Sequence, residues 1–130
     1  MTDVGLTHIA LEASDLDESI AFYATFAAMQ VVHRRSGVVW LGDKIRPFVV
    51  VLIQSDRIES SLCPPAHLGI ACAARDDVDR LAELARKQGR LIREPEDAGP
   101  PVGYWALIRD PDNHTLELSY GQEVAVTVEG

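Results

Sequence analysis

The stretch GLTHIALEASDLDESIAFYATFA, residues 5–27, is the most informative part of the chain because its hydrophobic pattern changes period midway. Residues 5–13 read as a β-strand, and residues 14–27 place apolar side chains at helical spacing. Ser14 or Asp15 can cap this helix, because a short oxygen side chain accepts hydrogen bonds from the free N–H groups of the first turn. Asp17 and Glu18 favour the positive end of the helix dipole. The stretch therefore predicts a strand that leads directly into an amphipathic helix.

The same order of elements occurs a second time. Residues 66–73, AHLGIACA, predict a strand, and residues 75–89, RDDVDRLAELARKQG, predict an amphipathic helix that ends at Gly89. Three short strands follow each helix, at residues 29–35, 37–42 and 47–54 in the first half and at residues 90–94, 104–110 and 114–120 in the second. We therefore predict an α+β protein of two β-α-β-β-β modules, about residues 4–55 and 66–121, with a C-terminal tail at residues 122–130.

Length and charge exclude several classes of protein. A chain of 130 residues can bury one core, so a single domain over residues 1–130 is expected. The net charge of −8, without a basic cluster, argues against nucleic acid as a partner. The longest apolar run, FVVVLI at residues 48–53, is far too short to span a bilayer, and the N-terminus has no signal-peptide pattern. We therefore expect a cytoplasmic protein with no membrane partner.

Aligning the two modules matches two histidines and sets a carboxylate against an apolar residue. His8 matches His67, and Val51 in the last strand of the first module matches Glu117 in the last strand of the second. Strand residues alternate between the two faces of a sheet, and the large apolar residues should face the helices. This leaves His8, His67 and Glu117 on the helix-free faces, beside small neighbours that leave room around them.

Two imidazoles and a carboxylate are the ligands of a 2-His-1-carboxylate site. If the helix-free faces of both modules curl around a common space, His8, His67 and Glu117 converge in it and can bind a divalent transition metal: Fe, Mn, Ni, Co or Zn. Taken singly, each histidine is more often a hydrogen-bonded or solvated residue, and Glu117 is more often a surface acid. The equivalent positions of the histidines in two modules, with an acid in a partner strand, favour the metal site.

Other side chains near this space are candidates for substrate binding. Trp40, Tyr104 and Trp105 lie on strands that border it, and aromatic walls suit a planar or apolar ligand, although core packing or a dimer contact is the commoner role. Arg109 can pair with a substrate carboxylate, or with its neighbour Asp110 in a turn. His114, in the turn before the last strand, is expected to be exposed.

The segments THIALEASDLDESIAFY at the front and DPDNHTLEL at the back resemble those of the vicinal oxygen chelate superfamily. This superfamily includes glyoxalase I, bleomycin-resistance proteins, fosfomycin-resistance enzymes and extradiol dioxygenases, and the resemblance covers about residues 4–121. It implies a curved eight-stranded mixed sheet around a central cavity, and a homodimer. It also implies that His8, His67 and Glu117 are metal ligands.

One position departs from the glyoxalase I pattern. Glyoxalase I has a further carboxylate where this chain has Val51, and its isomerisation needs a carboxylate there to move a proton between adjacent carbons. The resemblance therefore implies another metal-dependent reaction, of the lyase, isomerase or dioxygenase type, on a small substrate chelated through adjacent oxygens. The alternative is a ligand-binding protein of the bleomycin-resistance type that catalyses nothing. No residue is identified as the catalytic acid or base.

Overall fold

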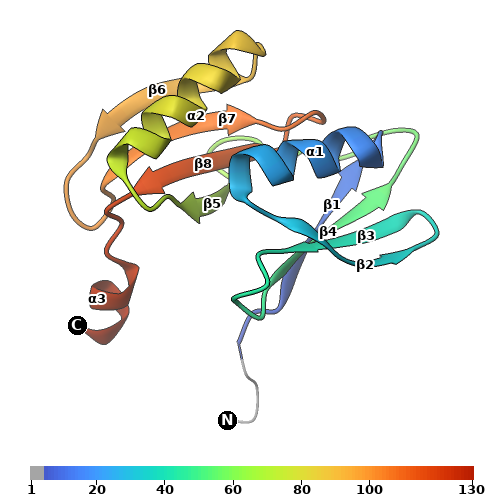
Figure 1. Cartoon of the computed structure of the whole chain (residues 1–130), viewed down its shortest axis with the longest axis horizontal. Helices are drawn as coiled ribbons and strands as arrows, with labels where there is room; N and C mark the ends of the chain where they lie inside the picture. Colours follow the sequence, from blue (N-terminus) through green and yellow to red (C-terminus); the bar gives the residue numbers. More distant parts are fainter. Residues whose placement is uncertain (1–4) are drawn as a thin grey trace. The chain divides into compact units, whose positions relative to one another are not determined.

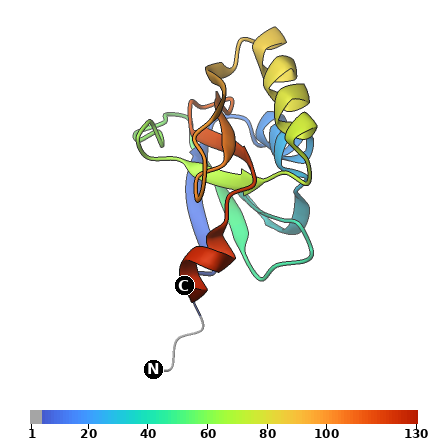
Figure 2. The same ribbon diagram turned by 90° about the vertical axis from the view of Figure 1, so that its left-hand side faces the viewer.

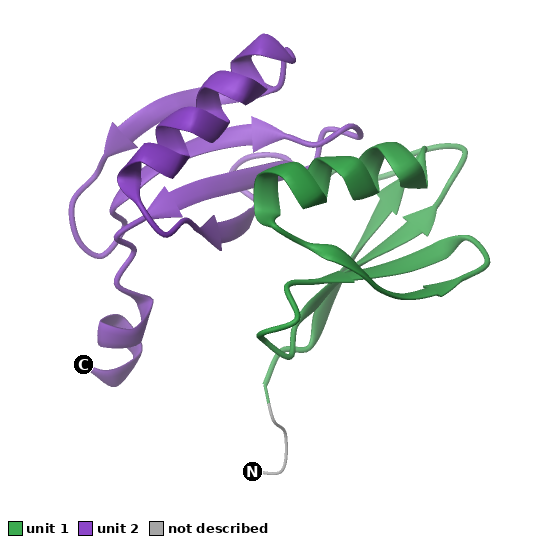
Figure 3. Ribbon diagram, viewed as in Figure 1, with its two compact units in different colours: residues 1–61 green, residues 62–130 purple. Residues whose placement is uncertain are grey.

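The computed structural model describes residues 5–130 and divides the chain into two compact units, residues 1–61 and 62–130 (Figures 1 and 3). Unit 1 contains β1 (His8–Ala13), α1 (Leu16–Ala27), β2 (Gln30–Arg35), β3 (Val38–Gly42) and β4 (Val49–Gln54). Unit 2 contains β5 (Leu68–Ala71), α2 (Arg75–Lys87), β6 (Leu91–Asp97), β7 (Tyr104–Arg109), β8 (Thr115–Tyr120) and α3 (Val124–Glu129). Both predicted β-α-β-β-β modules are confirmed, and with them the α+β fold class.

Unit 1 is a four-stranded sheet covered on one face by a helix. Its strand order is β1-β4-β3-β2, with β1 and β4 parallel and the other pairs antiparallel. The helix α1 packs on β2, β3 and β4 through a buried aromatic set, Phe22, Tyr23 and Phe26. The Asp15 carboxylate accepts a hydrogen bond from the Glu18 backbone N–H at 3.1 Å, so Asp15 is the helix cap.

Unit 2 repeats this architecture. Its strand order is β5-β8-β7-β6, and again only the first pair is parallel. The helix α2 lies along one face of the sheet and contacts β6, β7 and β8 (Figures 1 and 2). Val78, Leu81 and Ala85 are buried on its inner side. Each module therefore has its own sheet with one covered and one helix-free face; their joining into a single domain stays a prediction.

The strand register confirms the alignment of the two modules. In unit 1, Val51 of β4 pairs with Ala10 of β1 and with Trp40 of β3. In unit 2, Glu117 of β8 pairs with Gly69 of β5 and with Leu107 of β7. His8 lies two residues before Ala10, and His67 lies two residues before Gly69. The equivalences between His8 and His67 and between Val51 and Glu117 are therefore structural as well as sequential.

Two segments differ from the sequence expectations. The tail, for which the sequence predicted no structure, contains the short helix α3, with Val124, Val126 and Val128 exposed (Figure 1). His114 is only 1% exposed, which corrects the expectation of a solvated turn residue. The reason is that the chain near Leu62 runs beside the start of β8, where the Leu62 N–H donates to His114 Nδ1 at 3.0 Å. No helix within residues 5–130 is long and apolar enough to cross a membrane.

Candidate metal centre and ligand site

His67 and Glu117 face each other within unit 2. Glu117 lies in the middle of β8 and is 7% exposed, and His67 immediately precedes β5, the neighbouring parallel strand. The His67 Nε2 atom is 3.9 Å from the Glu117 Oε1 atom. Two of the three predicted metal ligands therefore come together on adjacent strands of one unit.

Gly69 leaves the space that the Glu117 carboxylate occupies. The two residues are direct register partners on β5 and β8. A Cβ atom added to Gly69 would lie 3.3 Å from Glu117 Oε2, closer than an ordinary van der Waals contact. A glycine at this position therefore lets the carboxylate lie across the neighbouring strand. Small residues stand beside the candidate ligands in the sequence, but only the register identifies Gly69 as the partner of Glu117.

The orientation of the His67 ring is fixed by a backbone group. The His67 Nδ1 atom is 2.8 Å from the Pro65 carbonyl oxygen. A carbonyl oxygen can only accept, so Nδ1 carries a proton and donates it, and Nε2 of the neutral ring has its lone pair on the side of Glu117. Metal-binding histidines characteristically use one ring nitrogen in this way and coordinate with the other. His67 therefore has the tautomer and the support of a metal ligand.

Burial determines the electrostatics of Glu117. Loss of solvent raises the pKa of its carboxyl group, and the nearby His67 works in the opposite direction, as the smaller influence. A charged carboxylate in this position is therefore costly without a compensating cation. The neutral imidazole nitrogen and the desolvated carboxylate form a donor set that fits a divalent transition metal.

The third predicted ligand, His8, belongs to unit 1. Its Nδ1 atom is 2.9 Å from the Thr7 hydroxyl oxygen, which can act as donor or acceptor, and its side chain is exposed at the start of β1. Within residues 5–130, no three histidine, cysteine, aspartate or glutamate side chains gather closely enough to hold one ion. The assembly of His8, His67 and Glu117 around one metal therefore stays a prediction.

The two neighbouring aromatic residues of β7 face opposite sides of the sheet. Trp105 lies on the face of Glu117, with the Arg93 guanidinium 4.7 Å from the centre of its ring. Tyr104 faces α2, where its hydroxyl hydrogen-bonds the Asp79 carboxylate and its ring lies under Arg75 at 3.8 Å. Tyr104 and Trp105 therefore point to opposite faces of the sheet, as adjacent strand residues do, and a role for Tyr104 in substrate binding stays a prediction.

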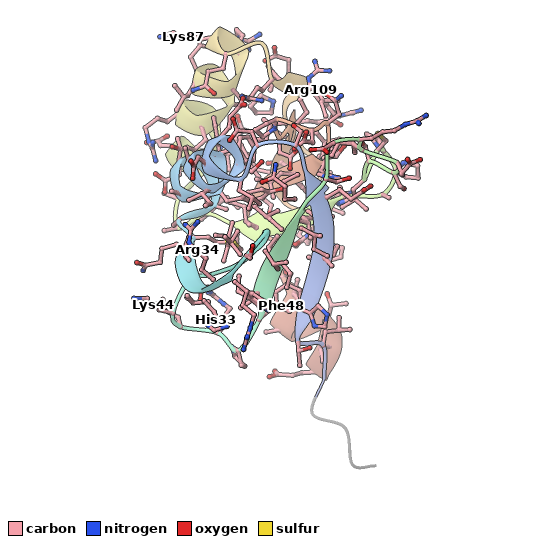
Figure 4. The ribbon with its side chains drawn as sticks, turned by 90° about the vertical axis from the view of Figure 1, so that its right-hand side faces the viewer. His33, Arg34, Lys44, Phe48, Lys87 and Arg109 are labelled. Carbon is pink, nitrogen blue, oxygen red and sulfur yellow. The ribbon has the colours of Figure 1, made fainter. Side chains whose placement is uncertain are left out.

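The other two candidate substrate residues have different surroundings. Trp40 of unit 1 pairs with Val51 and makes an edge contact with the ring of His33, 4.8 Å between centres. His33 and Arg34 lie on β2, the edge strand of that sheet (Figure 4). Arg109 is exposed at the end of β7 and lines a shallow pocket with Arg86 and Gly89 at the end of α2. Roles for Trp40 and Arg109 in substrate binding stay predictions.

Comparison with known proteins gives a family match over most of the chain. The family model of the glyoxalase/bleomycin resistance protein/dioxygenase superfamily matches residues 5–118. The uncharacterized protein PA2024 of Pseudomonas aeruginosa is 40% identical over 124 residues, which cover 90% of this chain and 89% of the relative. The lactoylglutathione lyase GLX1 of Arabidopsis thaliana is 28% identical over 120 residues, and the match spans 85% of this chain but only 42% of that enzyme.

A solved structure supports the fold. A point mutant of the fosfomycin resistance protein FosX from Listeria monocytogenes, in complex with Mn(II) and 1S,2S-dihydroxypropylphosphonic acid, superposes with a TM-score of 0.74 at 18% identity. The match covers 95% of this chain and 94% of FosX. At this identity the likeness establishes the fold alone. Taken with the family match over residues 5–118, it shows that the chain belongs to the glyoxalase/bleomycin resistance protein/dioxygenase superfamily.

Proposed function

We propose that the protein is a metal-dependent enzyme that acts on a small molecule bound through two adjacent oxygen atoms. The observation that carries this proposal is the pair of His67 and Glu117. The Pro65 carbonyl fixes the tautomer of His67, and the Glu117 carboxylate, which burial penalises, lies 3.9 Å from its free nitrogen. A buried carboxylate with no binding role would more often be directly hydrogen-bonded.

The metal would be held by His67 and Glu117 together with His8, the equivalent of His67 in unit 1. Imidazole and carboxylate ligands suit Fe, Mn, Ni, Co or Zn, and three protein ligands leave positions open for a substrate. Binding of Mn(II) by the structural neighbour FosX is consistent with this set. When bound, such a metal supplies Lewis acidity to the substrate oxygens. Trp105, on the face of Glu117, would form one wall of the site, and Trp40 and Arg109 are further candidates for contact with the substrate.

The reaction is proposed to differ from that of lactoylglutathione lyase, although GLX1 has that name. Val51 stands where unit 2 has Glu117, in the same register between Ala10 and Trp40. Valine can neither bind a metal nor accept a proton, so unit 1 lacks the second carboxylate that the isomerisation requires. Reactions that need only one carboxylate beside the metal, such as additions to the substrate or dioxygenase chemistry, fit this chain better.

A homodimer is also proposed, because each sheet in the structure ends in open edge strands, and family members commonly cover such edges with a second copy. Light scattering at micromolar concentration tests this, and a monomer would contradict it. A cytoplasmic location stays a prediction from the sequence.

The test is metal binding by protein purified without chelators. The wild type is expected to contain near-stoichiometric transition metal and, once stripped, to bind Mn²⁺ at one site per chain. His67→Ala and Glu117→Gln should weaken Mn²⁺ binding at least about 100-fold, because loss of outer-sphere partners alone costs roughly 10–100-fold. His33→Ala is the matched control, since it removes an exposed imidazole from the edge strand β2.

The same measurement distinguishes the alternative. A metal-free wild type that does not bind Mn²⁺ but binds hydrophobic drugs would support a sequestering protein of the bleomycin-resistance type and refute the enzyme. If metal binds, its identity and a panel of catechols, fosfomycin, and methylglyoxal with thiols would then identify the reaction.

A further inference from the structure

Buried polar atoms without a hydrogen-bond partner are rare in native proteins, because each one loses water and gains nothing in return. Among residues 5–130, three such side-chain atoms occur: Ser19 Oγ, Trp105 Nε1 and Thr115 Oγ1. Ser19 lies on α1 of unit 1. The other two lie on the helix-free face of unit 2, the face that presents Glu117. Their place beside a candidate metal ligand calls for an explanation.

Thr115 lies on the same strand as Glu117 and two residues before it. Alternation along β8 places both side chains on one face, with their Cα atoms about 6.6–6.8 Å apart. Thr115 is 1% exposed, and its backbone N–H is already paired with the Leu62 carbonyl at 2.6 Å. By register its neighbour on β5 is His67, because Leu68 pairs with Leu116. The unpaired hydroxyl therefore adjoins both candidate ligands of unit 2.

Trp105 approaches Glu117 from the other side. It pairs with Ser119, two residues after Glu117 on the same face of β8. Its indole N–H can only donate a hydrogen bond. Its ring lies against Arg93, whose guanidinium also pairs with Glu96. Trp105 and Thr115 thus lie on either side of Glu117 in the register of the sheet.

Ser119 provides the contrast within the same strand. It is as buried as Thr115, on the same face, and its hydroxyl donates to the Ile70 carbonyl at 2.8 Å. On this face, a buried hydroxyl with a purely structural role therefore has a hydrogen-bond partner within the fold. Leaving Thr115 and Trp105 unpaired costs stability that a bound molecule with acceptor atoms would recover.

We propose that the Thr115 hydroxyl and the Trp105 indole N–H donate hydrogen bonds to two acceptor atoms of the substrate, on either side of Glu117. This inference rests on the proposed function. The substrate would then carry two acceptor oxygens beyond the two that chelate the metal, as a dicarboxylate bound through one oxygen of each carboxylate does. An unsubstituted catechol or a hydrophobic drug offers no such atoms and would leave both donors buried and unpaired.

The proposal is tested with oxalate, which chelates through adjacent oxygens and keeps two outer oxygens as acceptors. Its affinity for the Mn²⁺-loaded protein is measured by calorimetry for the wild type, Thr115→Val, Thr115→Ser and Trp105→Phe. Thr115→Val and Trp105→Phe remove a donor and keep the bulk, and each should weaken oxalate binding about threefold to tenfold. Thr115→Ser retains the hydroxyl and should remain within about twofold of the wild type, as should the Mn²⁺ affinity of all variants.

A second readout needs neither metal nor oxalate. If the Thr115 hydroxyl is unpaired in the free protein, Thr115→Val should melt at a temperature higher than the wild type, by roughly 2–4 °C. Ser19→Ala is the matched control: it removes the unpaired hydroxyl of α1, should also raise the melting temperature, and should leave oxalate affinity unchanged.

The outcomes separate this inference from the proposed function. Unchanged oxalate affinity in both Thr115→Val and Trp105→Phe overturns the inference while the metal site stands. A lower melting temperature of Thr115→Val with unchanged oxalate affinity also overturns it, because the hydroxyl would then be satisfied within the fold or by water. If the wild type binds no Mn²⁺, the proposed function fails and this inference fails with it. Should Thr115→Val not fold, Trp105→Phe and Thr115→Ser still decide the question.

Discussion

Replacing Gly69 with alanine should weaken metal binding without weakening the fold. The added Cβ would lie 3.3 Å from Glu117 Oε2, so the carboxylate must move by a few tenths of an ångström. Metal–ligand distances are defined to about 0.2 Å, so this shift is enough to disturb coordination. We expect Gly69→Ala to lower Mn²⁺ affinity about tenfold, as loss of an outer-sphere partner does, and Gly69→Val, with two more methyl groups, to lower it further.

The free energy of unfolding should not fall together with the Mn²⁺ affinity. The displaced group is the end of a side chain, which moves cheaply, and alanine is favoured over glycine inside a strand by roughly 0.5–1 kcal/mol. The metal-free Gly69→Ala protein should therefore be as stable as the wild type or more stable by about 0.5 kcal/mol in urea unfolding. Gly42→Ala in β3 is the matched control, because the atoms nearest to its added Cβ are those of the Val32 and Val49 side chains and the Phe48 carbonyl, at 3.5–3.7 Å, an ordinary van der Waals distance.

The result that refutes this reasoning is specific. If Gly69→Ala and Gly69→Val bind Mn²⁺ as tightly as Gly42→Ala and the wild type do, the Glu117 carboxylate is not a ligand at the place where the structure puts it. If Gly69→Ala instead loses both stability and metal binding, the substitution acts on the strand pairing of β5 and β8, and displacement of the carboxylate is not the cause.

Three further outcomes are expected. Burial raises the pKa of the Glu117 carboxyl above its usual 4.5, so this group holds its proton more tightly in the folded metal-free protein than in the unfolded chain. Glu117→Gln should therefore raise the free energy of unfolding at pH 7, measured in urea, and this gain should fade as the pH falls through the raised pKa. A gain that stays constant with pH would contradict this. Asp15→Ala removes the α1 cap and should cost about 1 kcal/mol in the same assay, with unchanged Mn²⁺ affinity. Partial burial raises the pKa of the Cys72 thiol, so iodoacetamide should modify exposed Cys63 first, as followed by mass spectrometry; equal rates would refute the half-buried position of Cys72.

The family membership and the candidate site differ in how closely they limit the proposed function. Residues 5–118 match a superfamily whose members share a fold but run several reactions. Within it, this chain keeps an imidazole and a carboxylate together in unit 2 and has an apolar residue, Val51, at the equivalent place in unit 1. The asymmetry between the two modules is therefore the feature of this chain that bears most directly on the proposed function.

Local patterns in the amino-acid sequence were enough to predict the elements, their order and the equivalence of the two modules. Hydrophobic period and caps are local properties, so strand, helix and three strands could be predicted in each half, with Ser14 or Asp15 as the cap of the first helix. The repeated order of elements then aligned the two halves, with His8 matched to His67 and Val51 matched to Glu117. The strand pairs in the structure show the same equivalences. The alternation of side chains along a strand also indicates that Tyr104 and Trp105 point to opposite faces of the sheet, although both were predicted to bind the substrate.

Only the folded chain shows which residues hold the candidate ligands in place and which hydrogen-bond partners they have. The hydrogen bond from His67 to Pro65, the gap that Gly69 leaves for Glu117, and the burial of His114 beside Leu62 all depend on which segments lie side by side. The unpaired hydroxyl of Thr115 is of the same kind, because a threonine in a strand has no fixed hydrogen-bond partner until its neighbours are in place. Periodicity specifies the face on which a side chain lies, whereas its partners are set by contacts between residues distant in the sequence.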